Sequence, residues 1–556
     1  MLSISTWYNI EEKRYMKSKL LEIGIFAAIL GIFYINSSYV SYPDEFVNIL
    51  GGKVINGGGL PYKDYFDHHL PFAWYLSSLL LKVSFNSFAL FRVWYAVFQF
   101  IILALVALKI RKDYHEWYYP YLLYFALFPL AGIYFWFHLF LADSLAVLFF
   151  SAVFWILIAQ TFTKKVEFRL IVVTSLLTFA LVFSSLTFVY LVAALYLWQA
   201  YLLRHDLKKV IQFGAVAALP YGLYGIFLLL TGSLQDFYFS NVVYNTEHYI
   251  SIPNYVKGRF FNPVKFALTL IYNFYGDYVP LLTKIKYFDL YLPINTLAAL
   301  GTLTLMVLLF AFNPVVGLIF FLILSFSAPR SMIQGYKETD YQVSMFLMLG
   351  AASSIVAMAR MYKDKIAHTF CSDLRRVVQI ITAILFIFTF LFLAKNTYDK
   401  FFQRYTQKLP HLEDAAYTAD FVDGLLTKGD YFFIGPYEPD QEFFVKNGKL
   451  PGKYPTLLPQ FAEDEYLKKT FIEQFEKNPP TVIVYKHEAS IFGTPAVVFG
   501  AFFLDWMDGK YTSLENIPGV TVTGETTDIS LRSDLYIRND KQGEVLQKLR
   551  DKGYIQ

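Results

Sequence analysis

The chain of 556 residues contains a single cysteine and little charge. Cys371 has no partner for an intramolecular disulfide, and a zinc site built from several cysteines is excluded. Charged residues make up 17% of the chain, against about 25% in soluble globular proteins. The 48 basic and 44 acidic residues leave a net charge of +4, so nothing indicates binding to nucleic acid.

What the chain has in abundance is apolar and aromatic side chains. Hydrophobic residues account for 56% of it, aromatic residues for 19%, and the mean hydropathy is +0.41. This composition is typical of a protein with much lipid-facing surface. A helix satisfies its own backbone polar groups, so apolar runs of about 18–25 residues predict membrane-spanning helices. We expect about eleven: Leu20–Tyr39, Phe88–Ile110, Tyr118–Phe137, Leu139–Thr161, Phe168–Phe183, Leu186–Leu203, Val210–Leu230, Phe288–Phe312, Val315–Ser327, Tyr341–Met361 and Val377–Leu393.

Lysine and arginine alternate from loop to loop, which predicts the orientation in the membrane. Basic clusters precede the first span and follow the second, fourth, sixth and tenth. We therefore expect an integral protein of the cell (plasma or inner) membrane, with a cytoplasmic amino terminus and an extracytoplasmic carboxy-terminal region. The first apolar run is long and lacks a small-residue cleavage pattern, so we expect it to remain as a membrane anchor.

The composition divides the chain into two predicted domains. Residues 1–394 form a helical membrane domain with outer loops at 41–87, 231–287 and 328–340. Residues 395–556 mix charged and apolar positions and form a soluble α/β domain, which we interpret as accessory or acceptor-facing. We expect strands at Tyr431–Ile434, Thr481–Tyr485, Val520–Thr523 and Leu535–Arg538, and helices at Ala415–Leu426 and Ala462–Lys477.

The first outer loop has the densest group of ionisable and turn residues. Asp44 and Glu45 come just after the first span, where low-dielectric surroundings can tune a carboxylate to act as a general base. The alternative is that Asp44 only caps a short helix, Glu45–Lys53. Further along lies the sequence Tyr65-Phe66-Asp67-His68-His69-Leu70-Pro71. The segment Leu70–Phe85 is too short for a clear span, and we interpret it as juxtamembrane helix.

Asp-Glu after the first span, followed by Gly-x-x-Pro-Tyr-x-Asp and then Tyr-Phe-Asp-His-His-x-Pro, resembles the polyprenyl-phosphate-sugar glycosyltransferases of the GT-C type. The branch it resembles most contains the protein O-mannosyltransferases and the aminoarabinose transferases. The resemblance implies an inverting transfer of a hexosyl or pentosyl group to an acceptor hydroxyl on the outer membrane face. It assigns the general base to Asp44, with Glu45 as its neighbour, and assigns acceptor or loop positions to Tyr62, Asp64 and Asp67.

A second acidic position lies at the predicted outer start of the fourth span. In Leu141-Ala142-Asp143-Ser144, Asp143 matches an acidic residue found at a similar place in the GT-C-type family that the chain resembles. An ionisable group at the edge of an apolar helix is a functional candidate, because burying it without a partner costs free energy. Helix capping is the competing interpretation of Asp143, and the two roles are compatible.

The lipid phosphate of such a donor needs cations or hydrogen-bond donors near the outer helix ends. Arg330 is the first choice by resemblance, because guanidinium binds phosphate with two parallel hydrogen bonds. Other candidates in the outer loops are Lys337, Arg259, Lys265, His68 and His69. His68 and His69 stand where the aminoarabinose transferases have Glu-Lys-Pro-Pro, so for His69 phosphate or acceptor contact, metal ligation and loop hydrogen bonding all stay open.

No cofactor is required by the sequence, although a divalent metal is compatible with it. Asp44, Asp67, His68, His69 and Asp143 are able to surround an ion or to share one hydrogen-bond network. The expected partners are a polyprenyl-phosphate-linked sugar, the bilayer, and an acceptor protein, glycan or glycolipid. A polytopic transporter and a non-catalytic cell-envelope assembly protein are the alternatives, but transporters usually place polar groups near the bilayer midplane, and here they gather on one face.

Overall fold

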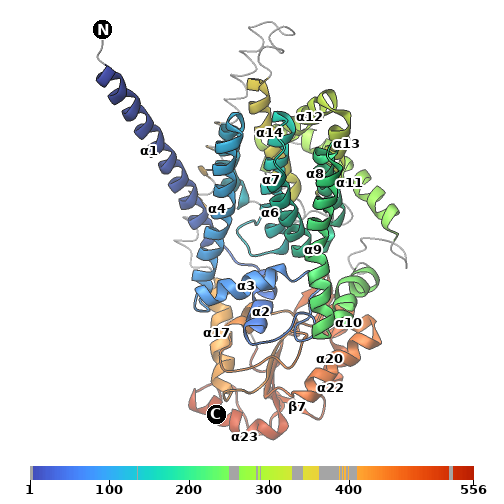
Figure 1. Cartoon of the computed structure of the whole chain (residues 1–556). Coiled ribbons are helices and arrows are strands. Elements are labelled where there is room, and N and C mark those ends of the chain that lie inside the picture. The colour runs from blue at the N-terminus through green and yellow to red at the C-terminus, as the bar shows by residue number, and fades with distance from the viewer. Residues whose placement is uncertain are drawn as a thin grey trace.

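The computed structural model of the chain describes residues 4–133, 135–249, 262–283, 286–287, 290–328, 342–361, 387, 391, 394–395, 398–399, 410–524 and 530–556. Long helices stand side by side in its upper part, and an α/β region of the carboxy-terminal third packs against one end of them (Figure 1). The short helices α2 (Pro43–Asn56) and α3 (Phe72–Val83) lie between these two parts. The first outer loop therefore lies where the helical part meets the α/β region.

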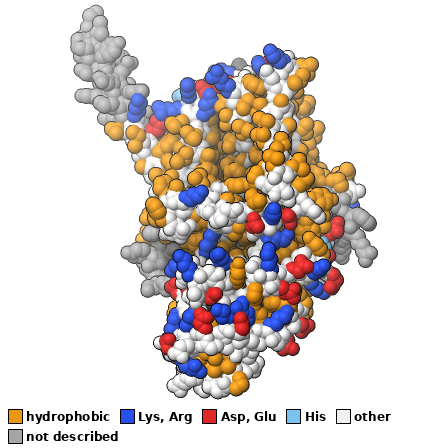
Figure 2. Space-filling model, turned by 60° about the horizontal axis from the view of Figure 1, so that its bottom comes forward, with side chains coloured by type: hydrophobic (Ala, Val, Ile, Leu, Met, Phe, Trp, Pro, Cys, Tyr) orange, Lys and Arg blue, Asp and Glu red, His pale blue; other side chains and the backbone are white. Residues whose placement is uncertain are grey.

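Five helical segments are long and apolar enough to cross a membrane: Lys19–Ser37 of α1 (Ile4–Ser37), α4 (Phe88–Asp113), α6 (Ala142–Thr163), Leu186–Leu203, which joins η2 (Leu186–Phe188) and α8 (Val189–Leu203), and α9 (Leu207–Thr231). Figure 2 shows that hydrophobic side chains dominate the surface of the helical part, whereas mixed charges cover the α/β region. This separation of surfaces is that of an integral membrane protein.

Helix α6 forms the centre of the helical part. Every residue from Ala142 to Phe162 is buried, which fits a helix that is apolar on all sides. Helices α4, α7 (Phe168–Ser184) and α14 (Gln342–Met361) pack against it. The helical part also contains α5 (Tyr118–Gly132), α11 (Pro263–Thr283), α12 (Leu292–Phe312) and α13 (Pro314–Ser325).

The predicted spans correspond to helices wherever the structure describes them, but the count of eleven is not confirmed. Several of these helices are shorter than a full crossing, and the last predicted span, Val377–Leu393, lies almost entirely outside the described residues. The expected outer loop 231–287 contains α11, a helix of 21 residues that sequence analysis did not predict, together with the short α10 (Leu234–Tyr238) and the π-helix η3 (Phe239–Tyr249).

Helix α2 begins earlier than predicted. Tyr42 occupies the cap position with extended backbone, Pro43 follows as the first helical residue, and no side chain caps the helix. Asp44 therefore lies inside the first turn, where a carboxylate complements the helix dipole, and the expectation that it caps the helix is wrong. A Cβ at Gly51 would overlap the indole of Trp74, so glycine allows α2 and α3 to pack closely.

The predicted juxtamembrane segment contains α3, which is amphipathic. Trp74, Leu81 and their neighbours are buried against the protein, while Tyr75, Leu79 and Val83 are exposed at intervals of four residues. Residues four apart share a helix face, so this helix presents an apolar stripe beside the membrane helices.

The carboxy-terminal part is an α/β region, as predicted, and its helices cover both faces of a sheet. Its four-stranded sheet has the order β3 (Phe432–Gly435), β4 (Val482–Tyr485), β8 (Leu535–Arg538) and β7 (Tyr511–Ser513), and only the β3–β4 pair is parallel. The face with Ile434 and Val484 shares a core with α17 (Pro410–Leu425) and α23 (Gln542–Asp551). The face with Phe433 and Ile483 shares a core with α20 (Glu465–Lys477) and α22 (Ala501–Met507). Two covered faces explain why β3 and β4 are continuously apolar.

Three of the four predicted strands are present. The fourth, Val520–Thr523, forms only an isolated bridge between Val522 and Ile555, and the sheet instead uses β7, which the sequence did not indicate. Residues 395–409 are hardly described, so the boundary at residue 395 stays a prediction.

The α/β region is joined to the first outer loop by packing and by hydrogen bonds. Phe66 lies in the same core as Tyr454 and Phe461, and its backbone N–H donates to the carbonyl of Lys453 at 2.7 Å. On α2, Phe46 packs against Phe443 of α18 (Pro439–Phe444) with ring centroids 5.6 Å apart. The two parts are thus held together around the candidate site.

Candidate functional site

A buried ion pair anchors the first turn of α2 to the membrane helices. The guanidinium of Arg92, on α4, donates to Glu45 Oε1 at 2.6 Å, and both side chains are almost fully buried. Arg92 also donates to the backbone carbonyls of Val40 and His138. Burial raises the pKa of Glu45, and the Arg92 charge and the Phe140 N–H, which donates to Glu45 at 3.1 Å, act in the opposite direction. Glu45 thus lies in a structural network inside the protein.

Asp44, the neighbouring residue, faces the α/β region instead. The hydroxyl of Tyr437, in the loop between β3 and α18, donates to Asp44 Oδ1 at 2.7 Å. Burial and the Asp44 carboxylate raise the pKa of the Tyr437 phenol well above its usual value, so this phenol stays protonated as a donor. Asp67 and Tyr42 also act electrostatically on Tyr437, which places all these groups in one neighbourhood.

A second cluster comprises Asp67, His68 and His69. Nδ1 of each histidine lies 3.1 Å from Asp67 Oδ1, and the backbone N–H of His68 donates to the same oxygen at 2.6 Å. Burial alone would raise the pKa of Asp67, but the two histidines outweigh it and hold this pKa well below its usual range. Asp67 is therefore a carboxylate at neutral pH.

The π-helix η3 covers this cluster. The ring of Tyr249 stacks on His68 with centroids 4.3 Å apart, and Asn245 Nδ2 donates to the carbonyl of His68 at 3.0 Å. On the other side, the hydroxyl of Tyr62 donates to the carbonyl of His69 at 2.9 Å. The two histidines are thus positioned by separate segments of the chain.

The cluster offers a set of metal ligands. One ligand atom from each of Asp67, His68 and His69 lies within 4.8 Å of the others, and imidazole and carboxylate together suit a divalent transition metal. Among the described residues, the structure brings neither Asp44 nor Asp143 into this group. A metal site that includes all five predicted residues is not formed.

The structure gives Tyr62 and Asp64 different surroundings. Tyr62 is fully buried with a positive φ of 67°, which places its ring beside Trp74 at 5.1 Å between centroids. Asp64 is exposed, and its Oδ2 accepts from the backbone N–H of Leu60 at 2.8 Å. Asp64 lies at the edge of a cavity that does not include Asp44.

Asp143 is buried in the first turn of α6, where it complements the helix dipole. Leu141 occupies the cap position, so the expectation that Asp143 caps the helix is wrong, whereas its dipole role holds. The segment before α6 is joined to α2, because Asn48 Nδ2 donates to the carbonyl of Phe140 at 3.2 Å. The starts of α2 and α6 therefore lie at the same end of the helices.

The predicted phosphate-binding residues in the later loops are Arg330, Lys337 and Arg259, and all three lie outside the described residues. Lys265 is described and is exposed near the start of α11. His68 and His69 are predicted phosphate contacts that the structure describes, and both lie within the first outer loop, next to Asp67.

Two residues of the site were missed by sequence analysis. Arg92 could have been found from the sequence, because burying an arginine within an apolar span costs free energy unless the charge is paired inside the protein. Tyr437 could not, because nothing in the neighbouring sequence distinguishes it from the other tyrosines among the 43 in the chain.

No family model and no curated protein sequence matches the chain. Among solved structures, the chain is similar to the crystal structure of ArnT from Cupriavidus metallidurans in the apo state, with a TM-score of 0.51 and 11% identity over 93% of this chain and 98% of that chain. It is also similar to the archaeal oligosaccharyltransferase AglB from Archaeoglobus fulgidus, in complex with an inhibitory peptide and a dolichol-phosphate, with a TM-score of 0.39 and 12% identity over 83% of this chain and 69% of that chain.

The likeness to ArnT covers nearly the whole of both chains and shows that this chain has the ArnT fold. The resemblance to GT-C-type transferases that the first-loop motif predicted is therefore confirmed at the level of the fold.

Proposed function

We propose that the chain is an inverting glycosyltransferase of the membrane, which moves a sugar from a polyprenyl-phosphate donor to an acceptor hydroxyl. The observation that carries this proposal is the position of Asp44, in the first turn of α2 and hydrogen-bonded to Tyr437 of the α/β region. The ArnT fold and the motifs of the first outer loop support it.

In this mechanism, Asp44 removes the proton from the acceptor hydroxyl as that oxygen attacks the anomeric carbon. The bond between that carbon and the phosphate oxygen breaks on the opposite face, and the bonding electrons leave with the polyprenyl phosphate. One displacement inverts the anomeric configuration. Phosphate is already a good leaving group, so the reaction needs stabilisation of the departing charge more than a separate acid.

The departing phosphate needs donors beside Asp44. His68 and His69 are candidates for this role, since the Asp67 carboxylate holds their rings in place through Nδ1. Arg330, Lys337 and Arg259 are further candidates by resemblance. Asp67, His68 and His69 would also be the residues to hold a divalent ion, which would supply positive charge to the phosphate.

Glu45 has a positioning role in this proposal, since its ion pair with Arg92 fixes the turn that carries Asp44. Asp143, at the start of α6, would contribute a second carboxylate at the same end of the helices.

The test is transfer of radiolabelled sugar in membranes loaded with polyprenyl-phosphate sugars, comparing the parent protein with Asp44→Asn. We expect Asp44→Asn to reduce transfer at least about a hundredfold, because general-base catalysis contributes about 10²–10⁴ in rate. Asp420→Asn is the control, since that carboxylate is exposed on α17, far along the α/β region. Full activity of Asp44→Asn would overturn the assignment of the base. A parent protein that transfers no sugar from any donor would favour the transporter or assembly-protein alternatives.

A further inference from the structure

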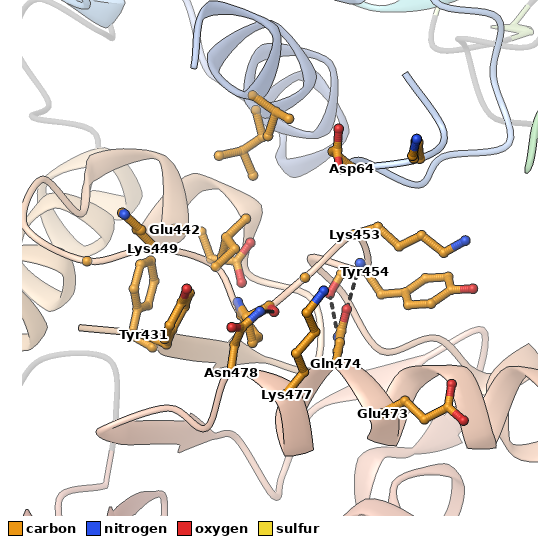
Figure 3. A pocket seen from close by; sticks show the side chains of 18 of the residues that line it. Asp64, Tyr431, Glu442, Lys449, Lys453, Tyr454, Glu473, Gln474, Lys477 and Asn478 are labelled. Carbon is orange, nitrogen blue, oxygen red and sulfur yellow. Dashed lines mark hydrogen bonds between the residues drawn. The ribbon is translucent and has the colours of Figure 1, made fainter. Parts of the chain in front are cut away.

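A separate cavity of about 680 Å³ lies between the first outer loop and the α/β region. Leu50, Lys53 and Val54 of α2 line one side, and Lys63 and Asp64 of the following loop continue it. The other side is formed by the start of β3, by residues 448–454 and by one face of α20 (Figure 3). Lys53 is nine residues from Asp44, or about 13 Å along a helix at 1.5 Å per residue. Asp44, Tyr437 and Asp67 do not line the cavity.

Lysines predominate among the charged residues of this cavity. Five of them line it, against the three carboxylates of Asp64, Glu442 and Glu473. Lys453 forms an ion pair with Asp236 at 2.9 Å, outside the cavity. The other four are Lys53, Lys63, Lys449 and Lys477, and none of them forms an ion pair with a residue that the structure describes.

Lys53 is held in place by backbone groups. Its Nζ donates to the carbonyls of Phe443 and Val445, both at 3.0 Å. An ammonium group has three N–H donors, so one remains for a ligand.

The buried wall of the cavity contains a poorly satisfied carboxyl group. Glu442 is 1% exposed, and neither of its oxygens has a described partner at ordinary hydrogen-bond geometry, although the backbone N–H of Ile434 and the charge of Lys53 favour its ionised form. Figure 3 shows Glu442 and Lys477 pointing toward the centre of this space, and Lys449 lining it on the other side of Glu442. A buried carboxyl group is costly unless hydrogen-bond partners satisfy it, so this position favours a ligand with hydroxyl groups, which both donate and accept.

The wall opposite α2 is rigid. Gln474 of α20 accepts from the backbone N–H of Tyr454 at 3.0 Å and donates to the Tyr454 carbonyl at 3.1 Å. Asn478 donates to the carbonyl of Pro451 at 2.7 Å, and a Cβ at Gly452 would overlap Gln474. Residues 451–454 are therefore fixed against α20, and the cavity is preformed.

We propose that this cavity binds an anionic saccharide, with its phosphate or carboxylate groups on the lysines and its hydroxyls on Glu442. Neutral sugars would leave the lysines without partners, and inorganic anions would leave Glu442 without donors. The binding site stands apart from Asp44, so it does not depend on whether the chain transfers sugar. That the ligand is a charged stretch of the acceptor glycan is a further step, which rests on the proposed function.

The test is saturation-transfer NMR on the purified full-length protein in detergent, which detects weak binding. Glucose 6-phosphate and glucuronic acid are the probes, and glucose, methyl phosphate and a triglutamate peptide are the comparisons, all of which have carbon-bound protons that the experiment detects. The first variant is the pair Lys449→Gln and Lys477→Gln, made together. Lys446→Gln is its matched control, because Lys446 is exposed near Lys449, pairs with Asp420 and does not line the cavity. Glu442→Leu removes the hydroxyl acceptor.

We expect both anionic sugars to bind and glucose to show no saturation transfer. The double lysine variant should weaken binding about tenfold, and Lys446→Gln should not change it. Glu442→Leu should leave the anionic sugars binding no better than methyl phosphate. A double lysine variant that binds like the parent, or equal binding of glucose, would overturn the proposal, as would the peptide binding more tightly than either sugar. If Glu442→Leu does not fold, the lysine variants still decide the question. Comparing the binding of glucose 6-phosphate with that of glucuronic acid shows whether the cavity prefers a phosphate or a carboxylate.

Discussion

The phenol of Tyr437 donates a 2.7 Å hydrogen bond to Asp44, although 393 residues of sequence separate the two. The α/β region thus contacts the residue proposed as the base, and does more than cover one end of the helices. Two further contacts hold α2 in place beside Tyr437: the ion pair of Glu45 fixes α2 to α4, and α18 packs against Phe46 of α2.

Replacing Tyr437 by phenylalanine should therefore impair transfer. Without the phenol, the Asp44 carboxylate loses a donor that fixes its orientation, and we expect kcat to fall about tenfold, in keeping with a loss of roughly 1.4 kcal/mol. The KM for the lipid donor should change little. Sugar transfer by purified protein measures both values, and Tyr466→Phe, an exposed tyrosine on α20, is the control. Unchanged kcat in Tyr437→Phe would show that this contact does not serve the reaction.

The contrast between Asp44 and Tyr437 shows what the sequence can and cannot predict here. The apolar runs determine where most helices form, and the Asp-Glu and Asp-His-His motifs identify the loop that carries the site. Long-range pairing has no local signal, so the donor to Asp44, the strand Tyr511–Ser513 and the pairing of Arg92 with Glu45 emerge only in three dimensions. The start of α2 was misjudged by two residues because Pro43 is favourable at the first helical position and begins the helix itself.

The buried ion pair of Arg92 and Glu45 predicts that losing the arginine alone destabilises the protein more than losing both charges. Arg92→Met leaves Glu45 buried without its cation, and such losses typically cost about 3–5 kcal/mol. We expect a clear fall in the midpoint of thermal unfolding, measured on the purified protein in detergent. Adding Glu45→Gln should restore part of it, since the uncompensated charge is removed. A double variant that is less stable than Arg92→Met alone would contradict this account of the pair.

The geometry of Asp67, His68 and His69 predicts how transfer responds to a chelator. Both histidines direct Nδ1 at the Asp67 carboxylate, so these nitrogens act as its donors. We therefore expect transfer to persist in EDTA, and His69→Gln to raise the KM for the lipid donor about tenfold through loss of a charge-assisted contact. His205→Gln, in the turn between α8 and α9, is the control. Transfer abolished by EDTA and restored by a divalent ion would instead assign these three residues to a metal.

Glu442 predicts a pH-dependent change in stability. Burial raises the pKa of Glu442 well above its ordinary value of 4.5, with the backbone N–H of Ile434 and the charge of Lys53 acting in the opposite direction. The folded state thus holds this proton more tightly than the unfolded state, and the stability gained from it is lost as pH rises above about 4.5. Glu442→Gln cannot ionise and should escape that loss.

The difference in unfolding midpoint between Glu442→Gln and the parent should consequently be small near pH 4.5 and grow toward pH 8, where we expect the variant to be more stable by at least about 1 kcal/mol. Thermal unfolding in detergent at several pH values measures it. Glu473→Gln, an exposed carboxylate of the same cavity, should leave the midpoint unchanged at every pH. A parent protein as stable as Glu442→Gln at pH 8 would mean that Glu442 is satisfied without a ligand. A stabilising Glu442→Gln would show instead that the chain keeps a costly carboxylate at the place where the saccharide is proposed to bind.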